Sequence, residues 1–244
     1  MPEVWIVVDE EVDETGKLVA SSPITAAMVN AIAQAAHSTD LKTLSSKLIY
    51  AGDLTDNLNA TEILFCPLTL NISPHFSFPH QQVYQACRDI LDLRHLVQQQ
   101  LGYPSGVGNL WLPVVWTKKG PLYAEAIGLA NSQELSENLS LSSISYIQPI
   151  HLSDAQRQLI YEFGFRLLKL LAAPPATYLI QFSFTDTQEQ ICFDRLWPFP
   201  AAPAIASLGI QSPDLFTCHF HCLTGLPIFD LVILKDKGED CKLG

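Results

Sequence analysis

Hydrophobic patterning over the first third of the chain predicts an α/β unit. Residues 4–8, VWIVV, are a continuous run of apolar, mostly β-branched side chains, which is typical of a strand buried on both faces. Residues 21–37 follow with apolar side chains at helical spacing behind a capping serine and a proline, which predicts a helix. Two further apolar runs, 47–53 and 62–68, predict strands. The order strand, helix, strand, strand indicates an α/β arrangement over residues 1–80.

Helical periodicity returns in residues 81–101, and the sequence GYPSG ends it. Residues 109–128 then predict two strands around a Gly-Pro turn at 120–121. The polar stretch 131–143 predicts a surface loop or a short helix, and residues 145–150 predict a short strand.

The strongest helix signal lies in residues 151–175, where Ser153 is expected to cap the helix and two prolines to stop it. The side chains expected to face inward are Leu159, Phe163, Leu167 and Leu170. Residues 177–184 and 189–197 predict an antiparallel hairpin around TDTQ. A last helix is expected over roughly 212–224, ending at Gly225.

Composition narrows the range of functions. The chain has 244 residues with 14 basic and 25 acidic side chains, a formal charge of −11, so it should repel phosphate backbones and we expect no nucleic-acid partner. No apolar run approaches the roughly 20 residues of a membrane span, and the N-terminus lacks the basic start of a signal peptide. The six cysteines are scattered without a framework spacing, which favours reduced thiols and a cytoplasmic location.

The sequence CHFHC, residues 218–222, has the residue types of a metal site. In a helix Cys218 and Cys222 share one face, whereas His219 and His221 point elsewhere, so the four side chains cannot converge on one ion. No second Cys/His pair with metal spacing occurs in the sequence. We therefore interpret the cysteines as core thiols and expect no metal site.

The same stretch carries a resemblance to a known family. Phe216, then His219 three residues on, then Gly-Leu-Pro beginning at Gly225, resembles the end of the ATP-grasp domain of carboxyaminoimidazole ribonucleotide synthetase. The segments CRDILDLRHLVQQQLGYPSG, LPVVWTKKGPLYAEAIG and TYLIQFSFTDTQEQICFDRLWP resemble, in order, the family's linker helix, nucleotide-binding strand and metal-bearing strands. The resemblance covers about residues 62–230 and identifies the chain as a degenerate, shortened relative of the ATP-grasp family.

The resemblance implies an α/β (α+β) fold of ATP-grasp type. Residues 1–80 would form the N-terminal α/β unit and residues 81–244 a reduced ATP-grasp domain. Within that domain the resemblance implies a short middle lobe, 103–148, and a C-terminal lobe, 149–244.

The family's chemistry makes an acyl phosphate from ATP, with Mg²⁺ on hard oxygen ligands and cationic side chains on the phosphates. By resemblance, the two metal-binding positions fall on Gln181 and Asp194, and the cations near the nucleotide on Arg94 and Lys118. A neutral amide is a weak Mg²⁺ ligand, and the family's polar substrate loop is replaced by PFPAAPA, residues 198–204. These four residues therefore indicate a vestigial nucleotide site, with no catalytic residue and no cofactor expected.

Three functions remain open. The leading expectation is a pseudoenzyme that acts through contacts with another protein or with itself, possible anchors lying in Trp197–Ala204, although that segment could instead cover the vacated site. The second is an active ATP-dependent carboxylate–amine ligase that uses ATP and Mg²⁺, with Asp194 helped by Asp186 or Glu189. The third is a nucleotide-sensing protein that uses Arg94 and Lys118.

Overall fold

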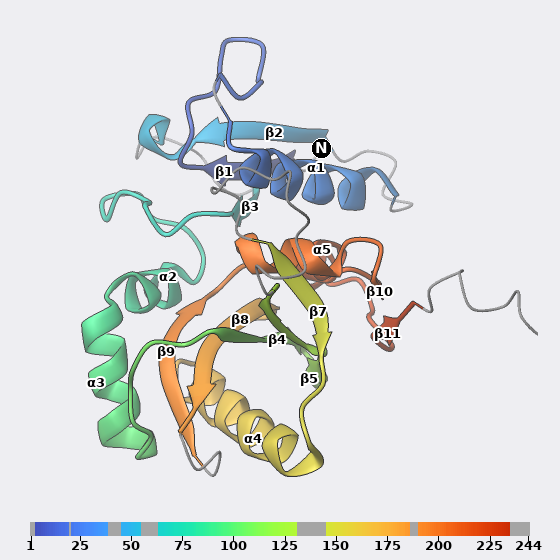
Figure 1. Ribbon diagram of the computed structural model, residues 1–244. Coiled ribbons are helices and arrows are strands. Elements are labelled where there is room, and N and C mark those ends of the chain that lie inside the picture. Colours follow the sequence, from blue (N-terminus) through green and yellow to red (C-terminus); the bar gives the residue numbers. More distant parts are fainter. Residues whose placement is uncertain are drawn as a thin grey trace, which may run out of the picture.

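The described residues form two main sheets with a helix between them, and a two-stranded sheet of β10 (Gln211–Ser212) and β11 (Val232–Ile233). The computed structural model describes residues 3–19, 21–38, 45–54, 63–130, 145–185 and 190–234. A small sheet and its helix α1 lie on one side of helix α5, and a larger sheet lies on the other (Figure 1). Within these ranges, no helix is both long and apolar enough to cross a membrane.

The small sheet is parallel, in the order β2-β1-β3. Its elements are β1 (Glu3–Val8), α1 (Pro23–Ser38), β2 (Ser45–Tyr50) and β3 (Ile63–Pro67). The three predicted strands and the helix are confirmed, except that residues 51–53 leave the strand as a short 3-10 turn. Side chains of β1 alternate, so that Val4, Ile6 and Val8 pack toward α1 while Trp5 and Val7 belong to a separate apolar cluster on the opposite face.

The larger sheet has six strands among the described residues, in the order β7-β6-β4-β8-β9 with β5 paired to β4. They are β4 (Leu110–Thr117), β5 (Gly120–Tyr123), β6 (Ala126–Leu129), β7 (Tyr146–Ile150), β8 (Ala176–Phe184) and β9 (Ile191–Trp197). The antiparallel hairpin β8–β9 is confirmed. Strands from the expected middle lobe, 103–148, and from the expected C-terminal lobe hydrogen-bond into this one sheet.

The turn between β4 and β5 differs from the prediction. Thr117 pairs with Gly120, so Lys118 and Lys119 form the turn and Gly120 already belongs to β5. The Thr117 hydroxyl accepts a hydrogen bond from the Lys119 amide at 3.1 Å and donates one to the Gly120 carbonyl at 2.7 Å. These local bonds replace the Gly-Pro turn that was expected at 120–121.

The helices follow the predicted pattern with one break. The single helix predicted over 81–101 is two, α2 (Gln81–Arg88) and α3 (Ile90–Leu101), because the Asp89 side chain accepts from the Asp92 amide and starts a new helix. The last helix, α5 (Leu215–Thr224), ends at Gly225 as predicted. The polar stretch 131–143, Asp186 and Glu189 lie outside the described residues.

Helix α4 (Asp154–Leu170) begins with the capping box formed by Ser153 and Gln156. Phe163 and Leu167 are buried as predicted, whereas Leu170 is 39% exposed and Ile160 is buried instead. The buried face of the helix therefore includes Ile160 and Leu168, and Leu159 is only partly buried.

Replacing Ser153 with alanine removes this cap and is expected to lower the free energy of unfolding by about 1 kcal/mol. Chemical denaturation of the purified chain measures the change. Ser153→Asp keeps a side-chain acceptor at the same position and should remain close to the unmodified protein. Equal loss in both variants would contradict a capping role.

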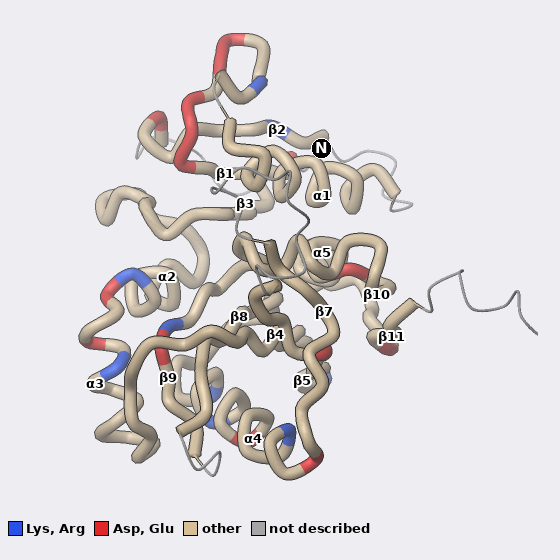
Figure 2. Tube along the Cα trace, in the orientation of Figure 1, with Lys and Arg blue, Asp and Glu red and all other residues tan. Residues whose placement is uncertain are grey.

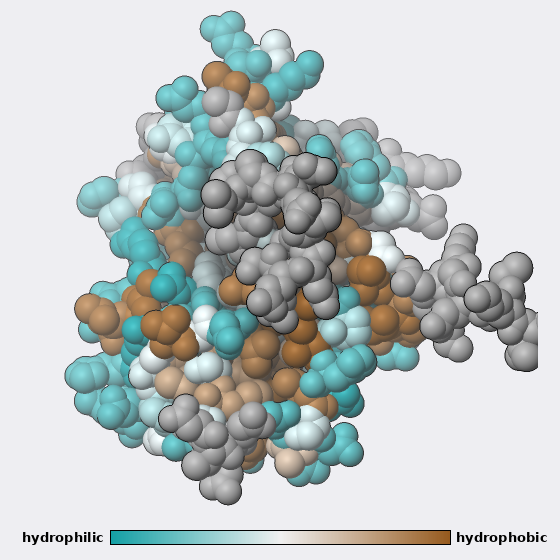
Figure 3. All heavy atoms as spheres, viewed as in Figure 1, coloured by the Kyte–Doolittle hydropathy of each residue, from teal (hydrophilic) through white to brown (hydrophobic). Residues whose placement is uncertain are grey.

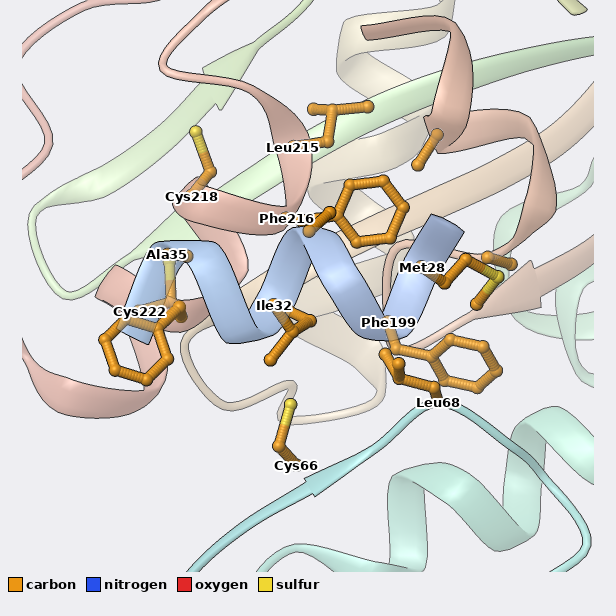
Figure 4. Packing of buried hydrophobic residues seen from close by; sticks show 14 of the residues in the cluster. Met28, Ile32, Ala35, Cys66, Leu68, Phe199, Leu215, Phe216, Cys218 and Cys222 are labelled. Carbon is orange, nitrogen blue, oxygen red and sulfur yellow. The ribbon is translucent and has the colours of Figure 1, made fainter. Parts of the chain in front are cut away.

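The largest apolar cluster joins the two halves of the molecule. Met28, Ile32 and Ala35 of α1 face Phe216 and Cys222 of α5 (Figure 4). Phe199 and Leu68 close the same cluster at the end of α1. On the other face of the larger sheet a second cluster packs α3 and α4 against β4, β8 and β9.

Charged and apolar side chains are unevenly spread over the surface. Acidic positions gather along the segment that follows β1 (Figure 2), where Asp9, Glu10, Glu11, Asp13 and Glu14 occur. Apolar side chains gather beside β10 (Gln211–Ser212) and β11 (Val232–Ile233), as Figure 3 shows. The segment Trp197–Ala204, in contrast, is mostly buried, with Phe199 at 4% and Ala204 at 0% exposure. Most of this segment therefore packs against the interior, and its role as an anchor for a partner stays a prediction.

Candidate functional site

Three of the four predicted site residues converge on a short glycine segment, residues 106–108. Arg94 of α3 donates through Nη2 to the Gly106 carbonyl at 3.1 Å. Gln181 of β8 donates to the Gly108 carbonyl at 2.6 Å, and Asp194 of β9 accepts from the Gly108 amide at 2.9 Å. A side chain could not replace the hydrogen of Gly108, because a Cβ there would lie 2.7 Å from the backbone of Phe182. Residues that the resemblance grouped in the sequence therefore do lie together in space.

Asp194 is turned toward this segment by a β-bulge. The register of β8 and β9 shifts between Gln181, which pairs with Arg195, and Phe182, which pairs with Phe193, so Asp194 has no residue opposite it. Asp194 is 2% exposed, and its carboxylate forms an ion pair with Arg94. Arg94 Nε also donates to the Asp194 carbonyl at 2.8 Å. Asp194 thus fixes the backbone of Gly108 and, through Arg94, holds α3 against the larger sheet.

These residues do not fit a magnesium ion. The Asp194 carboxylate oxygens accept from the Gly108 amide, Arg94 and Arg195, so they already have donors. Gln181 carries no charge, and its amide nitrogen is bonded to Gly108. Mg²⁺ prefers anionic oxygens in near-octahedral geometry, whereas the nearest charged neighbours here are two guanidinium groups. The donor set therefore favours an anion over a divalent cation.

Lys118 does not join the other three. It lies in the β4–β5 turn and lines two cavities that contain none of Arg94, Gln181 or Asp194. The four predicted residues are therefore divided in the structure. Arg94, Gln181 and Asp194 bind the backbone of residues 106–108, and Lys118 lies apart from them.

A cleft of about 660 Å³ lies between the small sheet and the larger one. One wall is formed by the carboxyl ends of β1 and β3 and the first turn of α1, the edge at which α/β sheets commonly bind ligands. The opposite wall is formed by the larger sheet and by Phe199 and residues 201–203. The segment expected to replace a polar substrate loop therefore lines this cleft.

The sheet wall of the cleft presents a row of three side chains. Trp111 of β4 pairs with Gln181 of β8, which pairs with Arg195 of β9, so all three lie side by side on one face. Arg195 is 39% exposed at its side chain, lies 3.3 Å from Asp194 and is stacked over Trp197 at 5.6 Å. The Trp111 indole N–H is buried and has no hydrogen-bond partner among the described residues. Arg195 therefore presents an exposed cationic donor on this wall.

The opposite wall carries an acceptor. The Asp9 carboxylate follows β1 and accepts from the Thr69 hydroxyl, which follows β3, at 2.6 Å. Thr69 in turn accepts from the Asn71 amide at 2.9 Å, which fixes its hydroxyl toward Asp9. Both walls of the cleft thus carry a charged side chain, the anionic Asp9 on one and the cationic Arg195 on the other.

Arg195 was not among the residues predicted from the sequence, because the resemblance points to its neighbour Asp194. Strand alternation gives a signal that could have found it, since Arg195 and Trp197 share one face of β9 with Gln181 opposite in β8. The bulge at Asp194 could not be seen in the sequence pattern.

The CHFHC stretch lies in α5 and is largely buried. His219 is fully buried, and its Nδ1 accepts a hydrogen bond from the Thr177 amide at 3.2 Å. Burial lowers the pKa of His219 to about 3 and raises the pKa of the Cys222 thiol to about 12, so both stay neutral at pH 7. Within the described ranges, no three His, Cys, Asp or Glu side chains are placed to hold a metal ion.

No family model matches the chain, and no curated protein matches it in sequence. Solved structures match along most of its length. The N5-carboxyaminoimidazole ribonucleotide synthetase of Thermus thermophilus superposes with a TM-score of 0.65 at 11% identity, over 93% of this chain and 79% of that one.

Two enzymes with other names match similarly. The glycinamide-RNase-transformylase T of Mycobacterium tuberculosis gives a TM-score of 0.61 at 14% identity, over 93% of this chain and 80% of that one. The L-amino acid ligase of Bacillus licheniformis gives 0.61 at 9%, over 91% and 74%. At such identities the likeness concerns the fold. The chain therefore has the ATP-grasp fold predicted by the sequence resemblance, in a form shorter than these enzymes.

Proposed function

We propose that this chain binds a small molecule carrying both a carboxylate and an amine in the cleft between its two sheets. The observation that carries the proposal is the row Trp111, Gln181 and Arg195 on one wall, facing a cleft whose other wall bears Asp9. Guanidinium groups bind carboxylates with two parallel hydrogen bonds, and Asp9 offers an anionic acceptor for an ammonium group.

The surroundings of Arg195 support a carboxylate as its ligand. The Arg195 side chain stacks over Trp197 and is 39% exposed, so its guanidinium can pair with a ligand carboxylate. The aromatic side chains of Tyr146, Trp197 and Phe199 also line the cleft, which suits an apolar or aromatic body between the two charged ends. An α-amino acid has this combination of groups, and one structural neighbour is named an L-amino acid ligase.

Arg195 also bears on phosphoryl transfer. A fixed positive charge beside Gln181 and Asp194 repels Mg²⁺, the ion on which transfer from ATP depends. We therefore infer that the chain is a binding protein in which Arg195 binds the anionic group of the ligand. This proposal includes no magnesium-dependent step.

An ATP-dependent carboxylate–amine ligase is the second candidate. The likeness to a solved synthetase, over 78% of its length, and to an L-amino acid ligase, over 74%, favours this activity over a role that depends on protein contacts alone. Release of phosphate from ATP in the presence of Mg²⁺ and an amino acid distinguishes the candidates, since the binding proposal expects none above a no-protein control.

Arg195→Met is expected to weaken amino-acid binding at least tenfold, because it removes the charge that pairs with the carboxylate. Isothermal titration with L-phenylalanine measures the affinity, and L-phenylalaninamide, which lacks the carboxylate, should bind weakly to the unmodified chain. Arg166→Met removes a surface arginine of α4 and serves as the control. Equal affinity for acid and amide, unchanged by Arg195→Met, would overturn the proposal.

A further inference from the structure

We propose a second binding site in this chain, for a small apolar carboxylate, in the cavity that Lys118 lines between β3 and the end of α5. The cavity measures about 310 Å³, which is the size of a small ligand pocket. It is separate from the cleft at Arg195, since the two share no lining residue.

One side of this cavity is apolar and poor in backbone hydrogen-bond donors. β3 is an edge strand of the small sheet, and the cavity lies along its residues Ile63, Leu64 and Phe65. Four prolines line it, Pro79, Pro174, Pro175 and Pro198, in addition to Pro67 in β3. Because proline has no amide hydrogen, these walls bind the apolar part of a ligand and leave its polar group to side chains.

The charge of the cavity selects an anion. An adjoining cavity of about 170 Å³ shares Lys118, Pro175, Cys222 and Gly225 with it and adds Lys119 and His221. Among the residues that the structure describes, no Asp or Glu lines either cavity, although the chain has 25 acidic and 14 basic residues. The Lys118 ammonium forms no ion pair or hydrogen bond within the part of the chain that the structure describes. A carboxylate would supply the partner that this ammonium lacks.

Lys118 could instead stabilise the C-terminus of helix α5, but the helix has other hydrogen bonds at that end. The ammonium lies beside the helix C-terminus, since a Cβ on Gly225 would be 3.9 Å from Lys118 Nζ. A cation there interacts favourably with the helix dipole. However, the His221 carbonyl already accepts from the Gly225 and Leu226 amides, so this carbonyl is capped without the lysine. Lys118 therefore remains available to a ligand.

Ligand-observed NMR and isothermal titration of the full chain test the site with three probes: 3-phenylpropionate, 4-phenylbutyrate and octanoate. At least one should bind, and its neutral amide should bind at least tenfold more weakly. Lys118→Gln should reduce the affinity for the acid about tenfold, and Lys118→Arg should retain it. Lys169→Gln is the matched control, because Lys169 lies in α4 and lines neither cavity.

The unliganded Lys118→Gln variant should keep nearly the thermal stability of the unmodified chain, which separates a ligand role from a purely structural one. The part of the binding that Lys118→Gln removes should persist in Arg195→Met, in which the cleft has lost its carboxylate partner, so the result does not depend on the cleft. The proposal is overturned if none of the three acids binds, if acid and amide bind equally, or if binding is lost in Arg195→Met but not in Lys118→Gln.

Discussion

Replacing Asp194 with asparagine is expected to lower the free energy of unfolding by about 3 kcal/mol. The change removes the charge that pairs with Arg94 and places an amide where the Gly108 N–H donates. Breaking a buried ion pair on one side costs about 3–5 kcal/mol. The lower end applies here because the Arg94 side chain is 25% exposed and can be partly hydrated. Urea denaturation followed by circular dichroism measures the difference.

A surface carboxylate provides the control for this substitution. Glu162 also lies near an arginine, Arg166, but it is 65% exposed, and the pair is separated by 3.8 Å. Glu162→Gln should change the free energy of unfolding by less than about 0.5 kcal/mol. If Asp194→Asn cost no more than Glu162→Gln, the carboxylate would not be fixing the glycine segment and would be free for another role.

Acidification is expected to destabilise the chain through His219. The pKa of this buried imidazole is lowered to about 3, whereas an unfolded histidine titrates near 6.5. The unfolded state therefore takes up the proton first as the pH falls below about 6.5, and stability decreases until the folded-state pKa is reached. By pH 5 the contribution amounts to a loss of about 2 kcal/mol.

His219→Gln isolates this contribution, since glutamine keeps an acceptor for the Thr177 amide but does not titrate. The unmodified chain should lose about 2 kcal/mol more than the variant between pH 7.5 and pH 5. NMR of the folded unmodified chain gives a second measurement that does not depend on the variant, because the His219 ring signals should not shift over this range. A midpoint near pH 6.5 for those signals would contradict the burial argument.

The sequence predicted the regular elements well where their periodicity was long and uninterrupted. The β1 run, the α1 pattern and the cap at Ser153 are local features, and local propensity determines them. The break at Asp89 was missed because the apolar spacing continues through it, and only the capping bond to Asp92 shows where one helix stops. The β4–β5 turn was misplaced because Gly-Pro is a strong turn signal, but pairing across the sheet set the register.

The candidate site was predicted only in part, for a physical reason. Motif resemblance grouped Arg94, Gln181 and Asp194, and in the structure these three residues contact the segment 106–108. The role of each residue depends on where its side chain points. The bulge in β9 turns the Asp194 side chain away from the cleft and leaves Arg195 facing it. A bulge depends on partners in a neighbouring strand, so sequence spacing alone cannot reveal it.

Helix α5 is wedged between both sheets, and this position limits how the molecule can change during evolution. Its side chains fill gaps in α1 on one side and in the larger sheet on the other. Exchanging or losing either half would expose apolar surface of the shared helix, so we expect neither half to be stable alone. New ligand specificities are therefore more accessible by altering single side chains in the cavities than by recombining whole segments.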